Sequence, residues 1–464
     1  MALAILHFAL LFWFGLYLIS RDLTSPRLRF AGLGLVSYAL GWACTILSPY
    51  SPAPALEVIL TRAGWTLLAL PATFWTGVLI TLLPEDVPLR ARLTRIWLYS
   101  ILPVIALCAL LSIGTSLVFD GTTSTPQPGF AYLIMSTLVL LPFVLAFCLA
   151  WPAIRLLRPK LARVVFLVTL LFLILSEGLF LLSQIWLPHT WIILLPGLDL
   201  FALGVALVVV DANERGESLL PDLFRSFDFS FGAALLFAGQ VALVILLGTG
   251  LTFPLLALLF TVLATSLAMQ MFSNPLAALL DAFAFFNLPR LQKARAELRA
   301  AGSVVPRVNQ TLDLQTLDDS EFARLTRRAL SQFGDLSRLA SRPLTYLPLV
   351  ETRLAERHAK DDVIERAIEL KALLSESIAR LKPQQKGDFG TSDEWRHYNA
   401  LFFPYIAGIK PYSRRAQHGN TDPIVQKALE WFRTAVPERT LHNWQTAATK
   451  LIAQDIRTRS TQSY

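Results

Sequence analysis

The chain has 464 residues, of which 54% are hydrophobic and 16% charged, and its formal net charge is +8. Soluble globular domains average about 25% charged residues, so part of this chain must be almost free of charge. Residues 1–286 contain 13 Lys/Arg and 13 Asp/Glu, whereas residues 287–464 contain 28 and 20. This asymmetry excludes a single soluble domain and indicates a membrane region followed by a basic soluble domain.

Nine apolar stretches are long enough, or nearly so, to cross the roughly 30 Å hydrocarbon core of a bilayer as helices. Their runs are continuous and do not alternate, which excludes a strand barrel. No basic residue precedes the first run and Arg21 follows it, so we expect this run to stay in place as a span and not to be removed as a signal peptide. The nine stretches are 3–19, 30–47, 64–83, 97–115, 131–152, 164–185, 192–210, 231–248 and 253–273.

The connections between the stretches differ sharply in charge. Loops 20–29, 84–96, 153–163 and 211–230 carry twelve Lys/Arg, and the alternate loops carry none. Basic loops stay on the cytoplasmic side of a membrane. We therefore expect nine spans with the N-terminus outside and the C-terminal domain in the cytoplasm, as in a bacterial-type multi-pass inner-membrane protein.

Few ionisable side chains lie inside the predicted spans, and such residues usually face the interior of a helical bundle. Glu177, Asp199 and the neutral Gln240 lie roughly 10–12 Å from the outer ends of their spans, with His7 a little shallower. Arg62, on the outer side, is a candidate counter-charge. These five residues predict an outward-opening pocket for a cationic or protonatable ligand. The alternative is that each carboxyl is neutral or bonded to a neighbouring helix.

After the last span the sequence changes character. Residues 275–286 are apolar with a single acid and predict an interfacial helix at the end of the membrane region 1–286. Residues 287–302 predict a basic connector helix beside the anionic inner surface, with Arg290, Lys293, Arg295 and Arg299. It serves either as a topological anchor or to transmit a signal.

Residues 303–464 show helical periodicity throughout and predict an all-helical cytoplasmic domain. Asp318 or Asp319 caps one helix, and Asp361 opens another that ends before Pro383. On the second helix Asp362 with Arg366, and Glu376 with Arg380, are spaced for ion pairs four residues apart. Its expected apolar stripe consists of Val363, Ala367, Leu370, Leu374, Ile378 and Leu381.

Two final helices within 422–457, joined by a tight turn that contains Pro437, have the layout of a helix-turn-helix. Segment 410–464 carries nine basic and four acidic residues, which suits nucleic acid. The turn lacks the usual glycine, and a helical protein-interaction module is the alternative. The candidate nucleic-acid contacts are Arg414, Arg415, Arg439, Thr440, His442, Asn443 and Gln445.

Catalytic and cofactor motifs are missing from the sequence. It contains neither a GxxxxGK[ST] nor a GxGxxG phosphate loop, and no histidine stands in a kinase-like setting. Cys44, Cys108 and Cys148 all lie in apolar runs without metal-ligand spacing. We expect neither an enzyme nor a protein with a cofactor or a bound metal.

The end of the seventh span runs Asp199-Leu200-Phe201-Ala202-Leu203-Gly204, followed by Asp211 and Gly216-Glu217. With these residues, short outer loops and an apolar bundle, residues 1–220 resemble the seven-span sensor region at the N-terminus of some bacterial histidine kinases. The resemblance implies a sensor role but assigns no binding residues. The chain departs from that family by two further spans and by the lack of a kinase domain.

The sequence thus favours a membrane-embedded sensor or regulatory protein that relays a signal to a cytoplasmic helical domain. Two alternatives remain: a membrane-tethered DNA-binding regulator, and a transporter in which Glu177 and Asp199 carry a coupling ion. The expected partners are the lipid bilayer and a cytoplasmic protein, with DNA and a second copy of the chain as further candidates.

Overall fold

The computed structural model is built almost entirely of helices, grouped in two compact units. The first unit comprises Met1–Asp211 and Leu223–Asp281, and the second comprises Ala212–Asp222 and Ala282–Tyr464. The structure describes residues 1–84, 88–120, 127–157, 159–181, 189–215, 219–248, 250–285, 295, 317–383, 387, 389–412 and 422–462.

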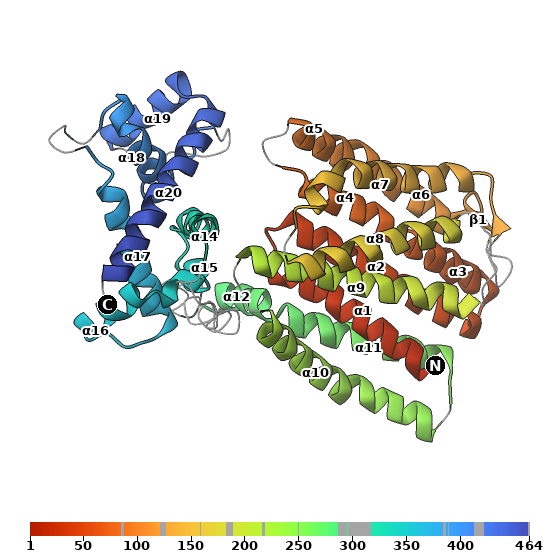
Figure 1. The fold of residues 1–464 in the computed structure, drawn as a ribbon. Coiled ribbons are helices and arrows are strands. Elements are labelled where there is room, and N and C mark those ends of the chain that lie inside the picture. The colour runs from red at the N-terminus through yellow and green to blue at the C-terminus, as the bar shows by residue number, and fades with distance from the viewer. Residues whose placement is uncertain are drawn as a thin grey trace. The chain divides into compact units, whose positions relative to one another are not determined.

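The helices as far as Ala284 make up the first unit, apart from the parts of α9, α10 and α12 that belong to the second. In Figure 1, α1, α2, α8 and α9 run close together in this unit. A two-residue antiparallel pairing joins β1 (Phe119–Asp120) to β2 (Gln127–Pro128). The helices are α1 (Ala2–Arg21), α2 (Pro26–Leu47), η1 (Ser48–Tyr50), α3 (Pro54–Leu68), α4 (Pro71–Leu82), α5 (Pro88–Ile96), the π-helical η2 (Trp97–Ile101), α6 (Leu102–Gly114), α7 (Tyr132–Ile154), α8 (Lys160–Leu181), α9 (His189–Arg215), α10 (Leu220–Leu247), α11 (Phe253–Met271) and α12 (Ser273–Ala284).

Within the described residues, nine helical segments are long and apolar enough to cross a membrane, which agrees with the nine predicted spans. Three of these segments join more than one helical element, and Pro26–Tyr50 is α2 followed by η1. Pro54–Leu82 combines α3 and α4, and Leu89–Gly114 combines most of α5 with η2 and α6. Proline begins α4 because a first-turn residue needs no N–H donor, so the chain starts a new helix at Pro71.

Glycines bring the first three helices unusually close together. A Cβ on Gly32 of α2 would lie 2.5 Å from the carbonyl oxygen of Gly15 on α1. A Cβ on Gly41, nine residues further along α2, would lie 2.9 Å from the carbonyl oxygen of Gly64 on α3. Helices in lipid associate mainly by close packing at small residues. The glycines of α2 therefore fix its position against both neighbours.

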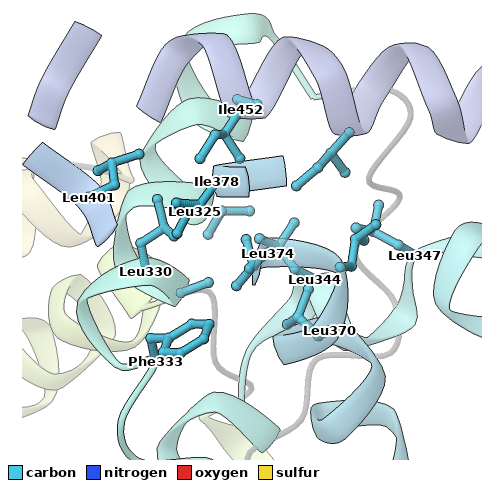
Figure 2. Close-up of a cluster of buried hydrophobic side chains, with 14 of the residues drawn as sticks. Leu325, Leu330, Phe333, Leu344, Leu347, Leu370, Leu374, Ile378, Leu401 and Ile452 are labelled. Atoms are coloured by element: carbon cyan, nitrogen blue, oxygen red, sulfur yellow. The ribbon is translucent and has the colours of Figure 1, made fainter. Parts of the chain in front are cut away.

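The second unit has its own core, formed where α14, α17, α18 and α20 meet. Figure 2 shows Leu325 and Leu330 of α14 with Leu374 and Ile378 of α17, and Ile452 of α20 beside them. Each buried leucine of this kind contributes about 1.5–3 kcal/mol relative to an exposed one. The elements are α14 (Asp319–Ser331), α15 (Leu336–Ala340), η4 (Pro343–Tyr346), α16 (Pro348–Glu356), α17 (Val363–Ala379), η5 (Asp393–Trp395), α18 (Arg396–Leu401), the π-helical η6 (Phe402–Ile406), α19 (Pro423–Ala435) and α20 (Glu438–Gln462).

The predicted apolar stripe of α17 is confirmed in its centre. Ala367, Leu370, Leu374 and Ile378 are all fully buried, while Val363 and Leu381 are half-buried at the two ends. The predicted cap of α14 is also confirmed, because the Asp318 carboxylate accepts a hydrogen bond from the backbone N–H of Glu321.

The N-terminal cap of α17 differs from the prediction by one residue. Asp362, not Asp361, caps the helix by accepting hydrogen bonds from the N–H groups of Ile364 and Glu365 at 3.0 and 2.9 Å. Asp361 is then left to pair with Arg366, with 2.5 Å between its Oδ1 and the arginine Nε. This hydrogen bond holds the pKa of the Asp361 carboxyl below its usual range. The predicted pair of Asp362 with Arg366 is wrong because the cap uses the Asp362 carboxylate.

The second predicted pair on α17 is replaced by contacts between helices. Glu376 binds Arg353 of α16 at 2.5 Å and lies 3.5 Å from Arg459 of α20, and Arg353 lowers the pKa of Glu376. Arg380 instead binds Asp455 of α20 at 3.1 Å. The prediction of a pair between Glu376 and Arg380 is therefore wrong, because both side chains reach partners on other helices.

Two predicted segments lie largely outside the described residues. In the basic connector 287–302 the structure describes only Arg295, which is helical. In the basic loop that follows Gly408, residues 413–421 are not described, so Arg414 and Arg415 cannot be assigned an environment.

The close approach of α1 and α2 can be tested with Gly32→Ala. The added methyl group would force the helices apart at the Gly15 carbonyl, and we expect the free energy of unfolding to fall by about 1–3 kcal/mol. Gly34→Ala on the same helix is the matched control, since its methyl group would lie 3.5 Å from Trp75, an ordinary contact. Thermal unfolding of the purified chain in detergent measures both variants. Equal melting temperatures for the two variants would contradict this packing.

Candidate functional site

One face of α1 and one face of α9 meet at matched positions along their length. His7, Phe14 and Arg21 recur every seven residues on α1, and seven residues are two helical turns. Their neighbours on α9 are Gly197, Gly204 and Asp211, at the same spacing. We name these six residues the α1–α9 seam. Because the positions on both helices increase together, α1 and α9 are parallel.

The seam depends on glycine for its closeness. A Cβ on Gly197 would overlap the Nε2 of His7 and approach Tyr38 of α2 to 3.0 Å. A Cβ on Gly204 would lie 2.7 Å from the Phe14 ring, which also packs on Phe201 with 4.7 Å between ring centroids. Larger residues at these two positions would push α9 away from α1 and α2.

Polar side chains gather at the end of the seam near the N-terminus of α1. His7 is 5% exposed, its ring meets Trp42 edge-on at 5.8 Å, and its Nε2 has no hydrogen-bond partner among the described residues. The Trp42 indole donates to the carbonyl of Ala4 at 2.9 Å, which holds that ring in place. The His7 ring is therefore held in place by packing, and its Nε2 is not used in a hydrogen bond within the described structure.

Glu177 brings a carboxyl to the same region from the C-terminal part of α8. It is 3% exposed, and neither carboxyl oxygen has a partner within the described chain. The carboxyl lies close enough to Tyr38 for an electrostatic interaction, and the Tyr38 hydroxyl hydrogen-bonds with the backbone of Gly197. His7, Tyr38, Trp42, Glu177 and Gly197 together are named the His7 cluster.

The chemistry of the His7 cluster is that of a small polar site in an apolar bundle. An unpaired polar group away from water costs about 1–3 kcal/mol, and an unpaired charge costs more. Glu177 and His7 present a carboxyl group and a ring nitrogen that have no hydrogen-bond partner in the part of the chain that the structure describes, which suits a hydrogen-bond donor or a small cation. Among the described residues, no group of three His, Cys, Asp or Glu side chains could hold a metal ion.

The other residues predicted for this site make no contact with the His7 cluster that is seen among the described residues. Asp199 is two residues beyond Gly197, a rotation of about 200° around α9, so its half-buried side chain leaves the helix on the opposite side. No interaction between Asp199 and Glu177 is seen in the described parts. Gln240 is exposed on α10, so it does not accompany the carboxyls inside the bundle as predicted. Arg62 is half-buried on α3, where its Nε has no partner among the described residues.

A buried ion pair closes the other end of the seam. Arg21 Nε lies 3.9 Å from Asp211 Oδ2, and the two side chains are 0% and 5% exposed. Arg21 also donates through Nη1 to the hydroxyl of Tyr17, one turn earlier, at 3.0 Å. Sequence reasoning counted Arg21 only as a loop charge. The signal that could have paired it with Asp211 is the repeat of seven that both helices share.

The predicted helix pair near the C-terminus is confirmed as α19 and α20, and Asp422 caps α19 through the N–H of Ile424. The second helix is, however, a central element of its unit. Ala448, Ile452 and Ile456 of α20 are buried in the core that α14 and α17 share. A recognition helix needs a free face along its first turns, and only the N-terminal part of α20 offers one.

Several predicted nucleic-acid contacts on α20 are engaged within the unit. Arg327 of α14 contacts the Nε2 of His442 at 2.7 Å, and Gln445 donates to the Ala400 carbonyl at 3.3 Å. Thr440 is half-buried, whereas Arg439 and Asn443 are exposed. Of the five candidate contacts on α20, only Arg439 and Asn443 are both exposed and without a contact to another helix among the described residues.

The α1–α9 seam can be tested by a double-mutant cycle on its ion pair. Arg21→Met would leave Asp211 buried without its partner, and breaking a buried pair in this way costs about 3–5 kcal/mol. Adding Asp211→Asn removes the unpaired buried charge. We therefore expect the double variant to lose about 0.5–3 kcal/mol less stability than the sum of the losses in the two single variants. Unfolding of the full chain in mixed micelles measures all three variants. Strictly additive losses would show that the two side chains do not interact.

Comparison with known proteins adds no relative to these observations. No protein-family model matches the chain, and no curated protein or solved structure matches it either. Functional conclusions for this chain therefore depend on the residues of the seam, the His7 cluster and the C-terminal unit.

Proposed function

We propose that the chain is a membrane-embedded sensor in which the His7 cluster takes up a small cationic or hydrogen-bond-donating ligand. The observation that carries the proposal is Glu177, a buried carboxyl whose two oxygens have no hydrogen-bond partner among the described residues and which interacts electrostatically with Tyr38. Ionisable groups inside a bilayer are expensive and commonly mark functional sites. The charge of the loops orients the cluster toward the outer face.

The signal would travel along α9. This helix carries Gly197 in the His7 cluster and Asp211 in the buried ion pair, and its last residues belong to the second compact unit, which begins at Ala212. A ligand that changes how α9 packs on α1 would therefore also move the end of α9, where the segment Ala212–Asp222 of the second unit begins. That unit, in the cytoplasm, would pass the signal to a protein partner.

The two alternatives have less support from the side-chain arrangement. A transporter with a coupling ion needs Glu177 and Asp199 close together, and Asp199 leaves α9 on the other side. A DNA-binding regulator needs a free recognition helix, and one face of α20, with Ala448, Ile452 and Ile456, is buried in the core of its own unit. A sensor needs one buried site and one connected helix, and both are present.

The ligand site can be tested on the full chain in lipid nanodiscs with a panel of small organic cations, from choline to spermidine. A cation that binds the folded chain should stabilise it by about 2.7 kcal/mol when its free concentration is 100 times its Kd. This stabilisation is measured as a raised melting temperature. Glu177→Gln should abolish that shift. Glu57→Gln, which removes an exposed carboxyl on α3, is the control and should keep it.

The relay has its own readout in the same samples. Binding should change hydrogen–deuterium exchange in residues 212–222 of the wild-type chain but not of the Glu177→Gln variant. A cation that stabilises the Glu177→Gln variant as strongly as wild type would place the ligand elsewhere. Stabilisation without any exchange change in the second unit would exclude the relay.

The C-terminal unit is expected to bind protein and not to read DNA sequence. Residues 303–464 made alone should bind duplex DNA weakly and equally for different sequences, because only the basic excess contributes, and moderate salt should remove that binding. Fluorescence anisotropy with two unrelated duplexes measures this. Sequence-preferring binding that Asn443→Ala weakens about tenfold or more would instead establish α20 as a recognition helix.

A further inference from the structure

A cavity lies at the opposite end of α2 from the His7 cluster. It has a volume of about 580 Å³ and is enclosed by the start of α2, the end of α4, and α5 with η2. Ligand pockets in proteins measure about 300–1,000 Å³, so this one can hold a small molecule or the polar part of a larger one. None of the residues predicted for ligand or nucleic-acid binding contributes to it.

The polar side of the cavity is strongly basic. Arg29 of α2 and Arg90 and Arg95 of α5 line it, and no acidic side chain is among its lining residues. Arg29 and Arg95 are exposed and have no carboxylate partner among the described residues, while Arg90 donates to the Leu83 carbonyl at 3.0 Å. Glu85 and Asp86 of the preceding loop lie outside the described residues. The charge of Arg29 and Arg95 is thus available to an anion.

The other side of the cavity is apolar and aromatic. Phe30 and Trp97 meet edge-to-face at 4.6 Å, with Ile80 and Leu98 beside them. Trp97 is 2% exposed, and its indole N–H has no acceptor in the described structure. The cavity therefore combines guanidinium groups with an apolar and aromatic wall, which suits an amphiphilic ligand.

The helix that leaves the cavity carries an exposed apolar surface. Tyr99 of η2 is 79% exposed, and Val104 and Leu107 of α6 are also exposed. In a membrane bundle, side chains of this kind face the hydrocarbon. η2 itself is a π-helical turn directly before Pro103, and such turns are frequent at functional sites. An acyl chain could therefore lie along α6 while its headgroup occupies the cavity.

We propose that this cavity binds an anionic glycerophospholipid, with the phosphate held by Arg29 and Arg95 and the chains lying over Leu98 and α6. Guanidinium groups form paired hydrogen bonds with phosphate oxygens, which favours an oxyanion over chloride. Basic pockets between membrane helices at the cytoplasmic side suit such headgroups, and Arg29 and Arg95 belong to the loops that predict that side. The apolar wall and the exposed face of α6 favour a lipid over a free phosphate.

The proposal can be tested by native mass spectrometry of the full chain in detergent, titrated with dioleoyl phosphatidylglycerol or dioleoyl phosphatidylcholine. We expect the anionic lipid to bind at least about tenfold more tightly. Arg29→Gln combined with Arg95→Gln should remove most of this difference. Thr94→Phe, which fills the cavity and keeps every charge, should also weaken binding of the anionic lipid.

The controls separate a built site from general attraction to charge. Arg92→Gln removes an exposed arginine of α5 that does not line the cavity and should change the Kd less than about twofold. Glu177→Gln should leave lipid binding intact, so the outcome is independent of the proposed ligand site. Wild-type affinity in the Arg29→Gln/Arg95→Gln variant, or equal binding of the two lipids, would overturn the proposal. Displacement of the lipid by glycerol 3-phosphate would identify a soluble phosphate as the ligand and overturn it as well.

Discussion

The close approach of α9 to α1 and α2 is the constraint on which the polar features of the first unit depend. Helices in a membrane gain little from the hydrophobic effect against one another, so they need small residues to pack tightly. Gly197 and Gly204 supply them, and each stands where a Cβ would press on a ring of the neighbouring helix. With α9 at that distance, His7 and Arg21 become buried at the two ends of one parallel seam.

Burial along this seam gives its two polar ends different chemistry. Arg21 has an opposite charge on the facing helix, so that end is satisfied from within the fold. His7 faces a glycine, which offers no side chain, and the described residues provide no hydrogen-bond partner for the carboxyl oxygens of Glu177. α1 and α9 are thus held together at one end by an ion pair, and at the other end polar groups lack hydrogen-bond partners among the described residues. A ligand at that second end can change how the two helices pack, provided that it binds one packing arrangement more tightly than the other.

Hydropathy and loop charge predicted the number of apolar helices because both depend only on the sequence along the chain. The same reasoning addressed how far along its helix each polar residue lies, but not which side of the helix its side chain leaves. Gln240 was placed at the level of Glu177, yet it lies on an exposed side of α10, and Asp199 leaves α9 on the side away from His7. In the second unit, the cap of α14 followed from local chemistry. Glu376, by contrast, left its predicted neighbour for Arg353 and Arg459, because tertiary partners compete with pairs along one helix. The seam could have been found from its repeat of seven, whereas the cavity beside Trp97 depends on α2, α4, α5 and η2 meeting in space.

The two proposed ligand sites have one element in common. Phe30 lines the cavity near the start of α2, and Tyr38 of the His7 cluster lies eight residues later, about 12 Å along the same helix. Gly32, between them, fixes α2 against α1 at a distance that leaves no room for a methyl group. A ligand that shifts α2 at either end therefore acts on a rigid and tightly packed element. Binding linkage is reciprocal, so a lipid that altered the affinity of the His7 cluster for its ligand would have its own affinity altered by the same factor. In this arrangement the membrane's anionic lipid content would become part of the signal that the chain reports.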